Sequence, residues 1–356
     1  MQKMKTTIYE INIDNIDEID KQKIKEFAEL LKQGETVIFP TETVYGLGAN
    51  ALDENAVSKI YGAKGRPSDN PLIVHIYDKG EVYDLASEVT ENAKIVMEKF
   101  WPGPITMILK KKDIVPSRTS GGLDTVAIRM PSHKIAREII KEAGVPIAAP
   151  SANISGRPSP TKAKHVIDEM TGRVSGILAG DDCNFGLEST VIDLTSDIPM
   201  ILRPGSITKE DLERELGQVE IDPSLNKKSD NIKAKAPGMK YTHYSPNAEV
   251  FIVAGDKKDV VNKINNMVKL DKEAGLTSGI MCINDRKEYY DGVVIGLGDT
   301  LEEVASHLFD SLIEMDKLKV DKIYSENFPT EGVGRAIMNR LLKSAGYKII
   351  DAKKEC

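Results

Sequence analysis

Residues 20–48, DKQKIKEFAELLKQGETVIFPTETVYGLG, contain the pattern that determines the fold class. One face of a helix is marked by apolar residues at helical spacing: Ile24, Phe27, Ala28 and Leu31. Gly34 stands where a left-handed helix cap is expected, and a β-branched run at 36–39 then stops at Pro40. The same alternation of helix and short strand continues along the chain. It predicts an α/β protein in which helices cover a sheet.

The later elements predict two domains. In the first, further strands are expected at 72–77, 105–109, 125–129, 147–149 and 190–194. Periodicity fails between Gly217 and Ala248, in a stretch rich in Pro, Ser, Asp and Lys that is typical of a linker. Beyond it, strands are expected at 249–253, 280–283, 293–295 and 322–325, with helices at 257–269, 301–315 and 334–344. We therefore predict a first domain at 1–217, a linker at 218–247, and a small parallel-sheet domain at 248–356.

Composition excludes several classes of protein. The 356 residues include 48 Lys plus Arg and 55 Asp plus Glu, a formal charge of -7, so the chain is not a basic nucleic-acid wrapper. Only 5% of residues are aromatic, which argues against stacking platforms for single-stranded nucleic acid. Cys183, Cys282 and Cys356 lie far apart without clustered histidines, which argues against a zinc site or a disulfide framework. No signal peptide or membrane span is evident, so we expect a cytoplasmic location.

Four polar, glycine-containing segments lie at the ends of predicted strands, where open α/β sheets bind ligands. The first is 40–48. Its glycines have the spacing of a dinucleotide fingerprint but lie several residues beyond the strand, unlike that motif. The segment is either a flexible turn or a loop that presents the hydroxyls of Thr41, Thr43 and Tyr45.

The second segment, 64–71, carries two cations separated by one glycine. Lys64 and Arg66 can clamp phosphate oxygens if the prolines stiffen this loop; otherwise they are solvated surface residues. His75, on the apolar strand that follows, is expected to be a satisfied core histidine. Arg129 ends a Val-Ala-Ile run, where its stem would lie against the sheet, so we expect it to have an anionic partner.

The third and fourth segments are 150–161 and 186–190, the latter followed by Arg203. Ser159 and Pro160 suit the N-cap and first residue of a helix, which either holds an anion or is simply capped. The P-loop, G-x-S-x-G and H-E-x-x-H motifs are all missing from the sequence. Chemistry by positioning and charge is therefore favoured over a covalent enzyme intermediate.

In combination these motifs resemble the threonylcarbamoyl-AMP synthase family, which has the YrdC-like fold. The resemblance rests on Pro40 to Gly48, Lys64-Gly-Arg66 through Asn70-Pro-Leu, Ser151-Ala-Asn153 and Glu188-Ser-Thr190. Two further stretches, Pro237 to Pro246 and Gly332 to Arg340, resemble the long form, which has an extra Rossmann-like domain. The resemblance implies a twisted mixed sheet with helices and a basic cavity, followed by a smaller α/β domain.

The activity implied by this resemblance converts L-threonine, bicarbonate and ATP into threonylcarbamoyl-adenylate and pyrophosphate. The product would feed N6-threonylcarbamoyladenosine formation at position 37 of tRNA through a downstream transferase complex. We expect no membrane association and no stable direct binding of nucleic acid. Two alternatives are an RNA-binding, translation-associated module, which the charge opposes, and a hydrogenase-maturation enzyme, whose acylphosphatase and zinc-finger units this chain lacks.

The resemblance also implies residue roles. Threonine would be held by Thr43, His75, Arg129, Ser151 and Ser189, with Arg129 on its carboxylate. ATP would be held by Arg66, Asn70, Thr125, Asn153, Thr161, Arg203 and Tyr244, although Ser159 could replace Thr161. Lys64 and Arg66 would be the catalytic cations, and Tyr244 would make the linker a lid. Mg2+ would bind mainly through the ATP phosphates, because no carboxylate cluster suggests an all-protein site.

Overall fold

The computed structural model describes residues 4–13, 16–226 and 243–354, and their contacts divide the chain into two units. The first unit comprises 1–155 and 159–240, and the second comprises 156–158 and 241–356. Within the described ranges, no helix is long and apolar enough to cross a membrane.

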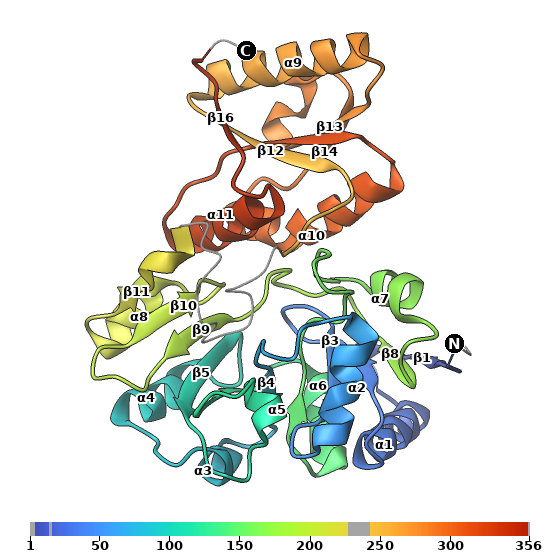
Figure 1. Ribbon diagram of the computed structural model, residues 1–356, viewed down its shortest axis with the longest axis vertical. Coiled ribbons are helices and arrows are strands. Elements are labelled where there is room, and N and C mark those ends of the chain that lie inside the picture. The colour runs from blue at the N-terminus through green and yellow to red at the C-terminus, as the bar shows by residue number, and fades with distance from the viewer. Residues whose placement is uncertain (1–3, 14–15, 227–242, 355–356) are drawn as a thin grey trace. The chain divides into compact units, whose positions relative to one another are not determined.

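The first unit is built on an eleven-stranded mixed sheet of order β1-β8-β2-β3-β7-β4-β6-β5-β9-β10-β11 (Figure 1). Its strands are β1 (Thr7–Glu10), β2 (Val37–Phe39), β3 (Gly46–Asn50), β4 (Ile73–His75), β5 (Ile105–Lys110), β6 (Thr125–Arg129), β7 (Ile147–Ala148), β8 (Gly176–Ala179), β9 (Thr190–Asp193), β10 (Met200–Arg203) and β11 (Glu220–Ile221). Its α-helices are α1 (Glu18–Lys32), α2 (Glu54–Lys64), α3 (Val82–Leu85), α4 (Glu91–Phe100), α5 (Ser117–Ser120), α6 (Lys134–Ala143), α7 (Ala163–Met170) and α8 (Lys209–Leu216).

Helices cover both faces of this sheet because side chains alternate along each strand. In β2, Val37 and Phe39 belong to a core formed with α1 and α6. Ile38, between them, belongs to the core formed with α2, α4, α7 and α8. The predicted helix at 20–33 corresponds to α1, with Gly34 at φ 76° just beyond its end. The predicted fold class is confirmed.

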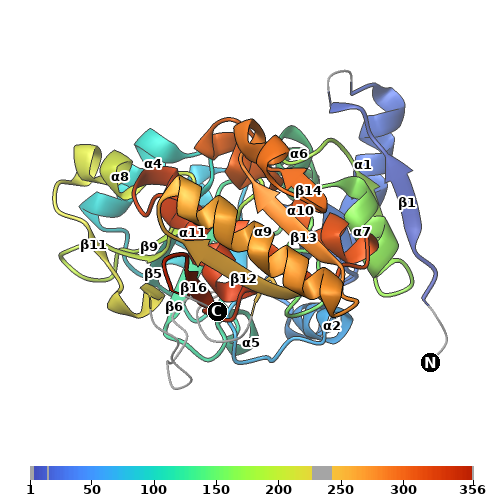
Figure 2. The ribbon, with the colours of Figure 1, turned by 90° about the horizontal axis from the view of Figure 1, so that it is seen from above.

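The second unit is a five-stranded parallel sheet of order β14-β13-β15-β12-β16. The strands are β12 (Glu249–Ala254), β13 (Ser278–Cys282), β14 (Val293–Gly296), β15 (Lys322–Glu326) and β16 (Ile349–Asp351). Figures 1 and 2 show α9 (Lys257–Glu273) on one face, with α10 (Leu301–Lys317) and α11 (Gly332–Ser344) on the other. Right-handed crossovers require this arrangement, because the chain moves along the sheet first in one direction and then in the other.

Two local predictions were wrong. Ser159 is not an N-cap, because α7 begins at Ala163 with Lys162 at the cap position. The segment predicted as a linker at 218–247 begins with ordered structure: β11 pairs in parallel with β10, and a short 3-10 helix follows at Pro223–Asn226. Residues 227–242 of the predicted linker lie outside the described ranges.

Candidate active site

The four polar segments are joined to one another by hydrogen bonds. The first segment meets the third through Leu47 N to Pro150 O (2.9 Å) and Ala152 N to Tyr45 O (2.8 Å). The residue just before the fourth segment meets the first through Phe185 N to Glu42 O (3.0 Å). The second segment meets the third through the Lys64 side chain, described below. Segments more than 80 residues apart in sequence therefore form one polar region of the first unit.

In the first segment, residues 41–45 form a rigid turn, and the residues from Gly46 onward belong to β3. The Thr41 hydroxyl donates to Val44 O (2.6 Å), so in its 2.9 Å contact with the Thr43 hydroxyl it must be the acceptor. The Tyr45 hydroxyl points inward, to Gly180 O (2.9 Å) and Asp181 O (3.1 Å). The flexible-turn alternative is therefore wrong, and so is the expectation that Tyr45 presents its hydroxyl to a ligand.

Arg129 has the anionic partner that its position predicted, and that partner is Glu42. Nη2 of Arg129 lies 2.7 Å from Oε1 of Glu42, and both side chains are only 4% exposed. Nη1 donates to the Thr43 hydroxyl at 2.9 Å. Burial raises the pKa of the Glu42 carboxyl, but the Arg129 guanidinium and, to a smaller extent, the backbone N–H groups of Glu42 and Ser132 together hold that pKa below its usual value.

Glu42 was not among the predicted site residues. The signal that could have identified it is a lone acidic residue between two threonines, in a segment that directly follows a buried strand.

His75 lies beside Arg129 because the two residues are register partners in the parallel strands β4 and β6. Its ring is buried, with Nδ1 3.2 Å from Ile73 O. Burial and then the neighbouring guanidinium lower the pKa of His75 to about 3, so the ring is neutral at neutral pH. It is thus both a core histidine and a neighbour of the predicted threonine site.

Lys64 is buried, and its amine is directed into the third segment. Nζ donates to Ser151 O and Asn153 O at 2.5 Å each and approaches Oδ1 of Asn153 at 3.4 Å. Burial and then Arg66 lower the pKa of Lys64 well below its ordinary value. Arg66 itself donates to Pro71 O at 3.2 Å. The structure thus brings Lys64 together with Ser151 and Asn153, as the predicted site requires.

Ser189 and Arg203 meet where β9 begins and β10 ends. Arg203 donates from Nη2 to the Ser189 hydroxyl and from Nε to Ser189 O, both at 3.0 Å. The same hydroxyl lies 2.8 Å from Thr106 Oγ1. The Arg203 guanidinium is thereby fixed against the fourth segment.

Thr161 and Ser159 differ in their capacity to bind a ligand. The Ser159 hydroxyl donates to Oε1 of Glu188 at 2.6 Å. The Thr161 hydroxyl is buried and has no hydrogen-bond partner in the part of the chain that the structure describes. The side-chain oxygen Oδ1 of Asn70 is likewise buried and has no hydrogen-bond partner among the described residues. Thr161 and Asn70 therefore keep hydrogen-bonding capacity that Ser159 has already used.

Thr125 and Tyr244 belong to other segments of the chain. Thr125 begins β6 and Arg129 ends it, so their Cα atoms are about 13 Å apart. The parallel pairing of Ile73 with Ala127 places Thr125 toward the end of β4 that follows the second segment. Tyr244 belongs to the second unit, where its ring packs 4.9 Å from that of Phe309. Its role as a lid stays a prediction, and the motif residues before His243 lie outside the described ranges.

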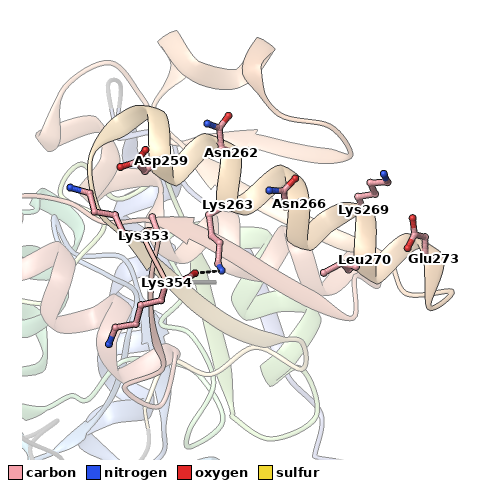
Figure 3. Close-up of a pocket in the computed structure, with 10 residues that line it drawn as sticks. Asp259, Asn262, Lys263, Asn266, Lys269, Leu270, Glu273, Lys353 and Lys354 are labelled. Atoms are coloured by element: carbon pink, nitrogen blue, oxygen red, sulfur yellow. Dashed lines mark hydrogen bonds between the residues drawn. The ribbon is translucent and has the colours of Figure 1, made fainter. Parts of the chain in front are cut away.

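The second unit contains a groove of about 780 Å3 between α9 and residues 352–354 (Figure 3). Inside it, Lys263 Nζ donates to Lys354 O at 2.6 Å. The lining mixes lysines with Asp259, Glu273 and asparagines, so it does not select one sign of ligand charge. Among the described residues, no group of three or more His, Cys, Asp or Glu could hold a metal ion.

Comparison with known proteins identifies the family. The family described as "Telomere recombination" matches residues 29–205, and "Threonylcarbamoyl-AMP synthase, C-terminal domain" matches 207–346. The threonylcarbamoyl-AMP synthase of Pyrococcus abyssi is 48% identical over 94% of this chain and 97% of its own length. That of Bacillus subtilis is 46% identical over 98% of this chain and 100% of its own length.

Solved structures agree with these matches. E. coli YciO has a TM-score of 0.51 at 27% identity, over 56% of this chain and 96% of its own. P. abyssi Sua5 complexed with L-threonine has a TM-score of 0.92 at 47% identity, over 97% of this chain and 99% of its own. The first unit is thus a YrdC-like α/β domain, followed by a Sua5-type C-terminal domain. The chain belongs to the threonylcarbamoyl-AMP synthase family.

Proposed function

We propose that this protein is a threonylcarbamoyl-AMP synthase, a nucleotidyltransferase that uses L-threonine, bicarbonate and ATP. The observation that carries the proposal is its similarity, over nearly its whole length, to the synthase of P. abyssi and to Sua5 complexed with L-threonine. The buried polar region of the first unit supports it independently, because it gathers the cations needed to bring several anions together.

The proposed residue roles are those that the resemblance implies, and several contacts support them. Arg129, fixed by Thr43 and Glu42, is the proposed partner of the threonine carboxylate, and His75 lies beside it. Ser151 and Ser189 are the other residues proposed to hold threonine. ATP is assigned to Arg66, Asn70, Thr125, Asn153, Thr161, Arg203 and Tyr244. The unpartnered Thr161 hydroxyl favours Thr161 over Ser159. Lys64 supports the ATP site by holding the loop that carries Asn153.

The reaction proceeds through two bond-forming steps. The ammonium group of threonine gives a proton to bicarbonate, which breaks down to carbon dioxide and water. The free amine then adds to the carbon dioxide and loses a second proton to solvent, which gives a carbamate. A carbamate oxygen attacks the α-phosphorus of ATP, the bond to the β-phosphate oxygen breaks, and pyrophosphate leaves with that electron pair. Both reactants are anionic, so the contribution expected of the protein is alignment and charge neutralisation by Arg66 and Arg203.

We further propose that Mg2+ arrives with ATP and is held mainly through the ATP phosphates. Bound in this way, Mg2+ would neutralise charge on the phosphates. We further propose that the product serves tRNA modification through a separate transferase in the cytoplasm, and that Tyr244 excludes water from the adenylate.

Release of pyrophosphate by the purified full-length protein tests this function. We expect release from ATP and Mg2+ only when L-threonine and bicarbonate are both present, with threonylcarbamoyl-adenylate identified by mass spectrometry. The matched control replaces L-threonine with D-threonine at the same concentration. A rate that does not depend on L-threonine would refute the proposed function.

A further inference from the structure

Glu42 is a buried acidic residue of the first unit that the proposed mechanism does not use. It lies in the rigid turn that the Thr41 hydroxyl closes, and its own carbonyl accepts from Phe185 N at 3.0 Å. Its side chain is 4% exposed, so the position of the carboxylate is determined by the fold. A buried carboxylate is costly unless it is paired, so its presence needs an explanation.

Arg129 supplies that pairing, because the other titratable groups that face Glu42 are neutral. The pKa of His133 is lowered to about 4 by burial, and the pKa of the Cys183 thiol is raised by burial. His75, behind Arg129, has a pKa of about 3. At neutral pH the charge on Glu42 is therefore balanced by the guanidinium 2.7 Å away.

Glu42 and Thr43 together orient that guanidinium. Thr43 accepts from Nη1 and Glu42 faces Nη2, so two successive residues of one turn contact two nitrogens of the same group. The Glu42 oxygens lack aligned hydrogen bonds, and Nε of Arg129 has no hydrogen-bond partner among the described residues. Glu42 and Arg129 are thus held together by electrostatic attraction and by the fold. The Arg129 guanidinium keeps an N–H group that can still donate a hydrogen bond.

We propose that Glu42 is a positioning residue that presets Arg129 to receive the carboxylate of the amino-acid substrate. The inference rests on the proposed function, in which Arg129 binds that carboxylate. Before substrate binds, Glu42 balances the buried charge of Arg129 and fixes the plane of its guanidinium. The Arg129 side chain therefore loses less conformational freedom when the substrate binds. It acts through Arg129 and does not itself contact the reacting atoms.

The test uses steady-state kinetics of the full-length protein with Glu42→Gln, Glu42→Asp, Arg129→Ala and the double variant Glu42→Gln/Arg129→Ala. We expect Glu42→Gln to lower kcat/KM for L-threonine about tenfold, with KM for ATP within about twofold of wild type. Glu42→Asp, which keeps the charge, should lose about threefold. Asp20→Asn, which removes a largely buried carboxylate paired with Lys23 in α1, is the matched control and should leave both parameters unchanged.

A double-mutant cycle separates positioning from general structural support. If Glu42 acts through Arg129, the double variant has the kcat/KM of Arg129→Ala, about a hundredfold below wild type, and not the further tenfold loss of independent effects. A further tenfold loss, or an equal effect of Glu42→Gln on threonine and ATP, would overturn the inference. If circular dichroism shows that Glu42→Gln does not fold, Glu42→Asp is used instead. An equal effect of Glu42→Asp on threonine and on ATP would then overturn the inference.

Calorimetric titration with L-threonine separates this inference from the proposed function. Wild-type protein that neither binds L-threonine nor releases pyrophosphate in its presence would refute the function, and the inference with it. Wild-type protein that binds L-threonine while Glu42→Gln binds it equally well would refute the inference alone.

Discussion

The amine of Lys64 is enclosed by oxygens of a single loop. It donates to the carbonyls of Ser151 and Asn153 and approaches the Asn153 side chain, and it is buried from solvent. A lysine whose only task was to meet ATP phosphates would have its donors free in the substrate-free protein. The contacts indicate a second task, which is to hold the loop that follows β7.

We therefore expect Lys64→Met to lower the free energy of unfolding by about 1 to 3 kcal/mol, because loop oxygens lose a buried donor. Urea unfolding of the substrate-free protein measures it. The control is Lys59→Met in the same helix, which breaks a half-exposed pair with Glu35 and should change stability by less than about 1 kcal/mol. A stability equal to or above wild type would show that Lys64 serves only a ligand, since removing a buried charge would then be neutral or favourable.

At the scale of elements, the predicted threonine and ATP residues are brought together by the order of the strands. The pairing of β4 with β6 puts His75 beside Arg129, and the antiparallel pairing of β9 with β10 puts Ser189 beside Arg203. Gly205 makes the second of these contacts possible. A Cβ at this position would lie 2.4 Å from Thr190 N and 2.9 Å from the carbonyl carbon of Ser189.

We expect Gly205→Ala to push the start of β9 away from Arg203. The free energy of unfolding should fall by about 1 to 3 kcal/mol, and KM for ATP should rise, because the atoms in the way belong mainly to the backbone. Gly62→Ala in α2 is the control: its Cβ would meet nothing within 4 Å, so it should stabilise the protein by about 0.5 to 1 kcal/mol. Wild-type stability and turnover in Gly205→Ala would show that this close approach is not needed.

At the scale of the whole molecule, each unit has a sheet and a hydrophobic core of its own. The first unit extends beyond the predicted boundary at Gly217, because β11 adds an edge strand to its sheet. Tyr244, the proposed lid residue, belongs by its contacts to the second unit.

A chain ending at Asn226 should therefore unfold cooperatively in urea, because it keeps all eleven strands. We expect its turnover to be strongly reduced, since Tyr244 is missing. The control is a chain ending at Gly217, which should be less stable because β10 loses its partner β11. Full turnover by the chain ending at Asn226 would remove the lid role from Tyr244.

Much of the fold could be predicted because its signals are local. The helical repeat from Ile24 to Leu31 and the uninterrupted apolar strands depend only on neighbouring residues. Strands β1, β3, β8, β10 and β16 were not predicted, and β11 lay inside the proposed linker. Most of these strands have only two to four residues, too few for a pattern to stand out. The five residues of β3 include two glycines, which are typical of a loop.

The sequence by itself determined the α/β class, the two-domain order and the four ligand segments, because helix period, strand composition and turn residues are encoded in adjacent positions. Only the tertiary structure decided that Arg129 faces Glu42, that the Lys64 amine is taken up by a loop, and that Ser159 donates to Glu188. Such contacts depend on which distant strands become neighbours in the sheet. They also depend on which hydrogen-bond donors are paired with an acceptor in the folded protein.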